Sequence, residues 1–170
     1  METSEYFRSI LFVDLISSTE VFFADLIRAV VAEYPHKIGR IQFELKDVLE
    51  ASSPSELVLR AAEEFIHKLM YEKPEDYLEK MCNTLSIEVD QIKPYWSKYI
   101  EAKARRDLGV HNNWKCNKTY LRKVAAVHLD VEATEGMMMS PKDRDYCSSV
   151  TENITKICEA MSRLVQEKHS

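Results

Sequence analysis

The sequence of 170 residues contains few of the residues that interrupt regular structure, with only 3 glycines and 5 prolines. A sheet-rich protein of this length needs many more of them, because hairpins and tight turns depend on glycine and proline. Their scarcity favours long helices that are joined by short connections.

Paired cysteines and long uncharged runs are also missing. The four cysteines form no CxxC pair, which argues against a standard zinc site and a disulfide framework. Charged residues interrupt the apolar region 10–34, so it leaves no span of about 20 uncharged residues for a transmembrane helix. The first residues, MET, are no basic leader, and we therefore expect no signal peptide and a cytoplasmic location.

The composition is that of a globular protein, with 45% hydrophobic and 30% charged residues. The length suits one buried core and is short for two ordinary domains. We expect residues 1–170 to form a single all-α domain, a bundle of six or seven helices.

Apolar residues three and four positions apart, together with capping residues, predict where the helices lie. Helices are expected over residues 4–33, 36–50, 54–71, from 74, from 88 towards 110, over 117–124 and from about 143 onward. Ser53, Pro54 and Glu56 form a capping box, and Ser86 is the expected cap of the helix over 88–110. The β-branched segment 124–139 is expected to be a loop or a short extended segment before the last helix.

The formal net charge of -5 hides a basic island between residues 93 and 123. Only two acidic residues, Glu101 and Asp107, accompany its nine basic ones. The nine are Lys93, Lys98, Lys103, Arg105, Arg106, Lys115, Lys118, Arg122 and Lys123. Such an island is either a binding surface for a polyanion or a solvated basic helix face.

Within the island, Arg106 and His111 have the side chains that metal-free RNA cleavage requires. A histidine can take the proton from a ribose 2′-hydroxyl or give one to the departing 5′-oxygen, and an arginine can stabilise charge at phosphorus. On a regular helix the two lie about 140° apart around the axis. Either Gly109 loosens the backbone, or side chains from two copies of the chain converge. Asp107, four residues before His111, is placed to orient its imidazole.

The segment RRDLGVHNNW resembles the motif of the HEPN superfamily, in which a histidine follows an arginine after four to six residues. The aromatic-rich PYWSKYIEAKA, the tyrosine of NKTYLRK and an amphipathic helix after SPKDRDY extend the resemblance over residues 88–168. It implies an all-α homodimer whose two motifs meet in a cleft at the interface. It further implies a metal-independent endoribonuclease without a cofactor, often a toxin or antiviral effector, that leaves a 2′,3′-cyclic phosphate.

Carried over by position, the resemblance makes Arg106 and His111 catalytic and places Asp107 at the polar position of the motif. The expected partners are an RNA substrate, a second copy and an antitoxin or sensor protein. Chemistry and proximity add four RNA-binding candidates, which are Arg105, Asn112, Lys115 and Tyr120.

Three other interpretations of the same residues stay open. The first is a catalytically inactive HEPN-like module that binds RNA, nucleotide or a protein partner, and the second is a purely structural assembly bundle. The third concerns the HNN sequence at residues 111–113, which suits a helix C-terminus with an asparagine in the left-handed conformation and a histidine or arginine facing the helix dipole.

Overall fold

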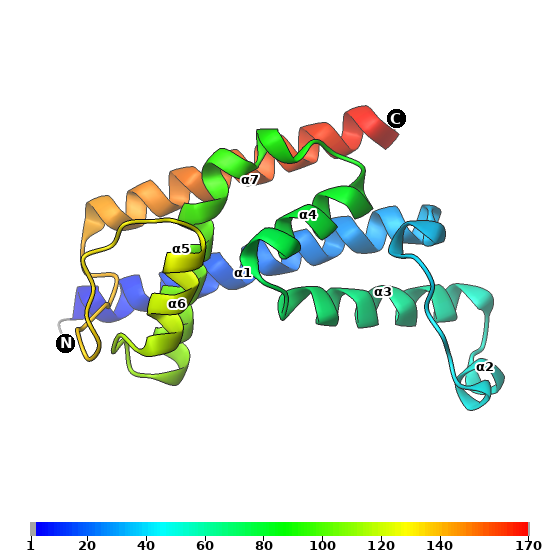
Figure 1. Ribbon diagram of the computed structural model, residues 1–170, viewed down its shortest axis with the longest axis horizontal. Coiled ribbons are helices and arrows are strands. Elements are labelled where there is room, and N and C mark those ends of the chain that lie inside the picture. The colour runs from blue at the N-terminus through cyan, green and yellow to red at the C-terminus, as the bar shows by residue number, and fades with distance from the viewer. Residues whose placement is uncertain (1–2, 170) are drawn as a thin grey trace. The chain divides into compact units, whose positions relative to one another are not determined.

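The computed structural model describes residues 3–169, and these are helical over most of their length (Figure 1). The helices are α1 (Thr3–Glu33), η1 (Pro35–Ile38), α2 (Leu45–Glu50), α3 (Pro54–Met70), α4 (Pro74–Leu85), η2 (Val89–Gln91), α5 (Lys93–His111), α6 (Lys118–Ala126) and α7 (Arg144–His169). No strand occurs within 3–169, so the prediction of an all-α fold with six or seven helices is confirmed. None of the described helices is long and apolar enough to cross a membrane.

The contacts divide the chain into two compact units. The first contains the chain up to Glu20 together with Asp90–Arg163, and the second contains Val21–Val89 and the residues from Leu164 on. The assignment of residues 1–170 to one domain stays a prediction. All candidate site residues lie in the first unit, which is therefore described in more detail.

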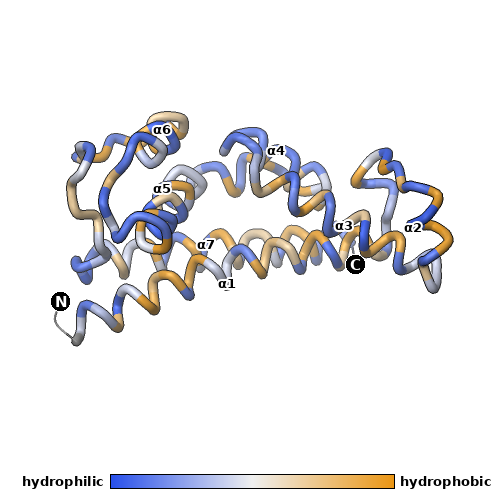
Figure 2. Tube along the Cα trace, turned by 90° about the horizontal axis from the view of Figure 1, so that it is seen from below, coloured by the Kyte–Doolittle hydropathy of each residue, from blue (hydrophilic) through white to orange (hydrophobic). Residues whose placement is uncertain are grey.

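In the first unit, α5 runs across the N-terminal parts of α1 and α7 (Figure 1). Along α7, hydrophobic and hydrophilic residues alternate as expected of a helix with one buried face (Figure 2). The helix α1 also buries one face, but it exposes the apolar side chains of Phe7, Ile10 and Leu11. Side chains from all three build the core, and the largest contributors are Phe12, Ile16, Trp96, Tyr99, Ile100, Val150, Ile154, Ile157 and Met161. This packing holds α5, the helix that carries the motif, at the centre of the unit.

The helix α6 packs against the C-terminal half of α5, and the following segment returns to the end of α5. Three backbone hydrogen bonds of 2.8–2.9 Å anchor it, from Cys116 N to Met137 O, Gly136 N to Cys116 O and Met139 N to Trp114 O. An isolated bridge joins Lys115 to Met138. The segment after α6 is thus a loop with one short extended contact, as predicted, although the helix itself continues to Ala126.

One helix that the sequence predicted in the second unit is not formed as expected. The helix predicted over 36–50 is wrong, because the structure has η1, an extended stretch and only the six residues of α2. Leu45 and Leu49 have helical spacing but are 74% and 76% exposed, so no packing partner stabilises a longer helix. The C-terminal end of α7 belongs to this unit, where His169 Nε2 lies 3.0 Å from Leu85 O.

The predicted caps have mixed outcomes. Ser53 Oγ accepts a hydrogen bond from Glu56 N at 3.3 Å, which confirms it as the N-cap of α3. The Glu56 carboxylate accepts instead from Ser52 N, at 2.7 Å. Ser86 does not begin a helix; its left-handed backbone, at φ 58°, ends α4, and α5 begins later, with Pro94 in its first turn. The prediction for Ser86 was therefore wrong.

We predict that Ser53→Ala lowers the free energy of unfolding by about 1 kcal/mol, because it removes the side-chain acceptor at the start of α3. Urea denaturation measures this change. Ser55→Ala, one residue inside the same helix, is the control and leaves the stability within about 0.5 kcal/mol. Equal effects of the two substitutions would contradict the capping role.

Candidate functional site

The motif lies on the last two turns of α5, which is regular through Gly109 and ends at His111. Two backbone donors, Asn112 N and Trp114 N, bond to Leu108 O at 2.8 and 2.9 Å and close the helix. Asn113 adopts the left-handed conformation at φ 48°. The left-handed asparagine of the helix-cap interpretation is therefore confirmed, and this cap is compatible with a function for the exposed His111.

Gly109 has a packing role. Trp114, also left-handed at φ 62°, folds its indole back onto α5 and is 8% exposed. A Cβ at Gly109 would lie only 2.5–2.7 Å from three ring carbons of Trp114. The absence of a side chain lets the indole reach the helix backbone, and Phe12 covers it with a ring-centroid distance of 6.1 Å.

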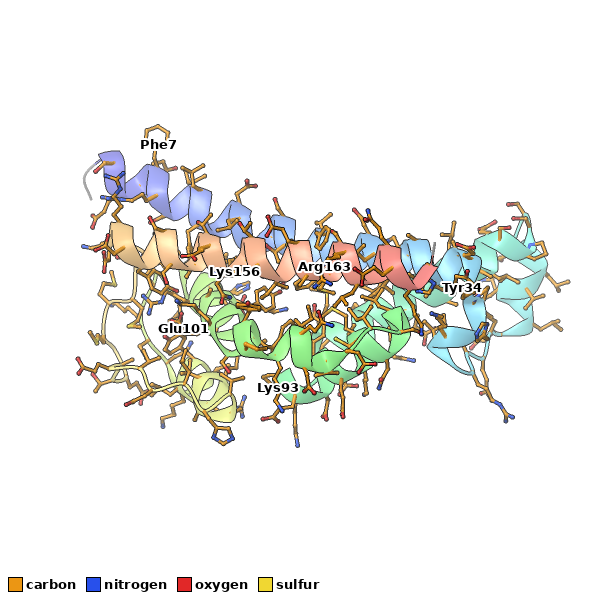
Figure 3. All side chains as sticks on the ribbon, turned by 90° about the horizontal axis from the view of Figure 1, so that it is seen from above. Phe7, Tyr34, Lys93, Glu101, Lys156 and Arg163 are labelled. Carbon is orange, nitrogen blue, oxygen red and sulfur yellow. The ribbon has the colours of Figure 1, made fainter. Side chains whose placement is uncertain are left out.

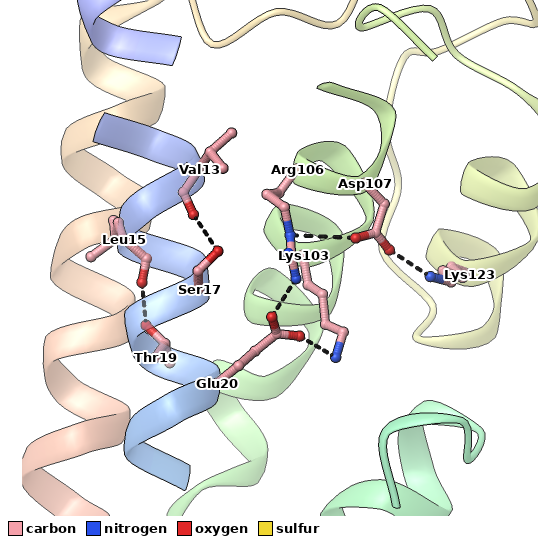
Figure 4. Close-up of polar contacts among 9 residues, drawn as sticks. All are labelled: Val13, Leu15, Ser17, Thr19, Glu20, Lys103, Arg106, Asp107 and Lys123. Atoms are coloured by element: carbon pink, nitrogen blue, oxygen red, sulfur yellow. Dashed lines mark hydrogen bonds and ion pairs between the residues drawn. The ribbon is translucent and has the colours of Figure 1, made fainter. Parts of the chain in front are cut away.

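Arg106 lies in a cluster of five charged side chains from α1, α5 and α6 (Figure 4). Its Nη2 donates to Glu20 Oε2, and its Nε lies 3.3 Å from Asp107 Oδ1. Lys103 Nζ lies 2.6 Å from the other Glu20 oxygen, and Lys123 Nζ donates to Asp107 Oδ2 at 2.9 Å. The structure thus brings Arg106 and Asp107 together, but carboxylates already contact the guanidinium, and the Arg106 side chain is only 16% exposed.

His111 stands apart from this cluster. It is exposed, and its side chain makes no hydrogen bond to any residue in the described range. Asp107 does not orient the His111 imidazole as expected, because its two carboxylate oxygens contact Arg106 and Lys123. Since α5 is unbroken, Arg106 and His111 differ by about 140° in direction and about 7.5 Å along the axis. Loosening at Gly109 is thereby excluded, and convergence of two copies stays a prediction.

The carboxylate of Glu101 organises a second, buried cluster. Glu101 is 2% exposed; its Oε1 accepts from Tyr120 Oη at 2.6 Å and Arg105 Nε at 2.8 Å, and its Oε2 from Tyr146 Oη at 2.7 Å. The Arg105 guanidinium also lies 4.0 Å from the centroid of the Tyr146 ring. Burial, reinforced by the charge of Glu101, raises the pKa of Tyr120 and Tyr146, so both phenols remain donors. Figure 3 labels Glu101 among the side chains.

Two of the predicted RNA-binding residues belong to that cluster. Tyr120 is 1% exposed and its hydroxyl bonds to Glu101, so neither its ring nor its hydroxyl is on the surface. The Arg105 side chain is 14% exposed and is held by the same carboxylate. Both positions indicate a structural role in place of the RNA-binding role expected from the sequence.

The other two candidates lie where α5 ends. Asn112 Nδ2 donates to Lys115 O at 2.6 Å and so stabilises the turn. The Lys115 side chain is exposed, and it makes no ion pair with any described residue. Of these two, Lys115 is therefore the one whose charged group remains available to a ligand.

The basic island is partly neutralised by the fold. Four of its nine cations pair with Glu20, Glu101 or Asp107, and these are Lys103, Arg105, Arg106 and Lys123. Other cations of the island are exposed and make no ion pair with a described residue. These are Lys93, Lys115, Lys118 and Arg122. The last three follow the end of α5 or lie on α6, so the unpaired positive charge is on the part of the island that follows His111.

The sequence analysis missed Glu20 and Tyr146. Glu20 is 86 residues from Arg106, yet it follows Phe12 and Ile16 at four-residue steps on the buried face of α1. A carboxylate on a buried helix face requires a cation or several donors, and this requirement could have indicated from the sequence that Glu20 has a charged partner. For Tyr146 the sequence contains no comparable signal.

Within residues 3–169 no group of three or more His, Cys, Asp or Glu side chains is arranged to hold a metal ion. No family model, no curated protein and no solved structure matches the chain. Any function must therefore be argued from the chemistry of the residues and from the resemblance of the motif.

We predict that Gly109→Ala lowers the free energy of unfolding by about 1–3 kcal/mol, because the new methyl group collides with Trp114. On a helix without that contact, the same substitution stabilises by about 1 kcal/mol. A double-mutant cycle tests the cause, since Gly109→Ala in a Trp114→Ala background should be neutral or stabilising. An equal loss in both backgrounds would show that Trp114 is not responsible.

Proposed function

We propose that the chain is a metal-independent endoribonuclease of the HEPN type that acts as a homodimer. The observation that carries the proposal is the position of His111. It is exposed, its side chain makes no hydrogen bond to the described residues, and it ends a helix that is fixed by a cap. Unpaired cations, those of Lys115, Lys118 and Arg122, follow it along the chain and suit the backbone of RNA.

The proposed reaction needs no group beyond the RNA and these side chains. The ribose 2′-oxygen attacks the adjacent phosphorus and forms a new P–O bond while the bond to the 5′-oxygen breaks. The 2′-hydroxyl loses its proton and the departing 5′-oxygen gains one, and His111 serves this proton transfer. Arg106 stabilises the charge that develops on the phosphoryl oxygens, and the product carries a 2′,3′-cyclic phosphate.

Arg106 must exchange one partner for this role. Its guanidinium is bound to Glu20, so an RNA phosphate has to replace that carboxylate. Lys103 lies 2.6 Å from the other Glu20 oxygen, and Glu20 would therefore keep a cation after the exchange. Asp107, whose charge repels phosphate, is partly neutralised by Lys123.

The geometry of α5 supports the homodimer. Since one regular helix directs Arg106 and His111 to different sides, two copies of the chain are needed to bring them to one phosphate. Val110, beside His111, and Met138, paired with Lys115, are 52% and 51% exposed. A second copy at this end of α5 would bury both side chains.

A binding module without catalysis is the second candidate, and the occupied state of Arg106 favours it. Such a module would bind RNA, nucleotide or a protein partner through the same exposed cations, without cyclic-phosphate products. An active nuclease would be a toxin or defence effector controlled by an antitoxin or sensor protein.

We predict that the purified protein cleaves labelled RNA in the presence of a chelator and that His111→Ala lowers the rate by at least about 100-fold, because it removes the proton-transfer group. Product analysis should show 2′,3′-cyclic phosphate ends. His67→Ala, an exposed histidine on α3, is the matched control and should leave the rate unchanged. Full activity of His111→Ala, or cleavage that requires added metal, would overturn the proposal; RNA binding without cleavage would support the second candidate.

We further predict that Arg106→Ala and His111→Ala, each inactive alone, regain activity when the two chains are co-expressed with different tags and purified as a mixed dimer. In that dimer, one site would receive Arg106 and His111 from different chains, so about half of the wild-type activity per dimer is expected. If both residues act within one chain, no mixed dimer contains an intact site, and absence of recovery would contradict the composite site.

A further inference from the structure

A second site candidate lies in the first unit, where α1 and α7 begin side by side. A cavity of about 730 Å³ opens there between Arg8 and Ser4 of α1 and Arg144, Ser148 and Thr151 of α7. Its volume lies in the range of small-molecule sites, and the depression is widely open to solvent. Two arginines and three hydroxyl groups form its polar wall, and the positive ends of two helix dipoles add to its potential.

Neither arginine makes an ion pair with a described residue, although Lys142 and, to a lesser extent, Arg8 lower the pKa of Glu5. Within the described part of the chain, Arg8 Nη2 reaches only Ser4 Oγ, at 3.5 Å, and its Nε is buried without a hydrogen-bond partner. A buried guanidinium nitrogen is stabilised by an acceptor, so an anion bound here would satisfy Arg8 Nε.

The nearby carboxylates do not supply that anion. Glu5 Oε1 lies 2.9 Å from Lys142 Nζ, and the pKa of Glu5 is lowered by this contact. Glu152, on the cavity wall, accepts from Lys156 at 2.6 Å, a residue labelled in Figure 3. The lining thus holds two arginines and one carboxylate, which is paired with Lys156 outside the lining, so its charge is positive on balance.

An apolar groove continues from the cavity. It is a partly open groove of about 190 Å³, and Leu11, Phe12 and Leu15 of α1 are among its lining residues. Arg8, Cys147 and Thr151 line both spaces, so one molecule can occupy the two together. The groove has room for a planar ring and is too small for a long acyl chain.

We propose that this site binds a nucleotide, with its phosphate on Arg8 and Arg144 and its base in the groove against Leu11 and Phe12. Two arginines from different helices suit the several acceptor oxygens of a phosphate. An inorganic phosphate would leave most of the cavity empty, and a nucleoside would leave the arginines without an anion. The nucleotide is either free or part of an RNA strand, and the site does not depend on the ribonuclease proposal.

Calorimetric titration of the full chain with AMP, GMP, UMP and CMP tests the proposal. At least one nucleotide should bind about tenfold or more tightly than adenosine or inorganic phosphate, because only a nucleotide fills both spaces. No binding of any nucleotide, or equal affinity for adenosine and AMP, would overturn it.

Substitutions locate the ligand. Arg144→Gln, at an exposed position, should weaken nucleotide binding about tenfold or more, and Arg8→Gln should do the same with the fold verified by circular dichroism. Leu11→Gln should weaken binding of nucleotide but not of inorganic phosphate. Arg163→Gln, later on the same helix, is the control and should bind as the wild type does. An unchanged affinity in Arg144→Gln would overturn the assignment.

A competition experiment separates the two sources. A five-nucleotide RNA that displaces AMP from His111→Ala protein, and that binds more weakly to protein that also carries Arg144→Gln, identifies an RNA strand as the ligand. RNA that fails to displace AMP identifies a free nucleotide. Both results come from binding alone, so the outcome is independent of whether the chain cleaves RNA.

Discussion

The first unit depends on one buried charge, the carboxylate of Glu101. Placing a carboxylate at 2% exposure is strongly unfavourable unless several donors surround it. Here Arg105 contributes from α5 itself, Tyr120 from α6 and Tyr146 from α7. A shift of any one of the three helices would leave a donor or the carboxylate unpaired, so the cluster fixes their register.

That register determines what the motif can do. The Glu101 cluster holds the middle of α5, so the conformation of its last turns depends on contacts close by. There the Trp114 indole packs against Gly109, and α5 stays helical as far as His111. A regular helix of this length directs Arg106 towards Glu20 of α1, while His111 faces solvent. The fixed and regular helix α5 therefore both stabilises the unit and keeps the two motif residues apart. Under the ribonuclease proposal, the functional unit is then a pair of chains.

Local patterns were sufficient for much of the fold. The helices α1 and α7 were predicted because their apolar spacing alone defines a buried face. The same spacing failed for residues 36–50, since Leu45 and Leu49 have no surface to cover. Ser86 failed for another reason, because a serine can begin a helix or, in the left-handed conformation, end one. The sequence located the residues of the motif, but it did not predict the partner of Arg106, because Glu20 is 86 residues away.

The distribution of charge along the sequence differs from the distribution of unpaired charge in the folded chain. Counted along the chain, the positive charge is concentrated between residues 93 and 123, yet distant or neighbouring carboxylates pair with four of those cations. Arg8 and Arg144 are far apart in the sequence and have acidic residues within three positions, but the fold places both beside one cavity, and neither makes an ion pair with a described residue. A ligand responds to the unpaired charge at a surface and not to the count along the chain. The search for anionic ligands should therefore begin with the cavity at Arg8 and Arg144 as well as with the exposed lysines after His111.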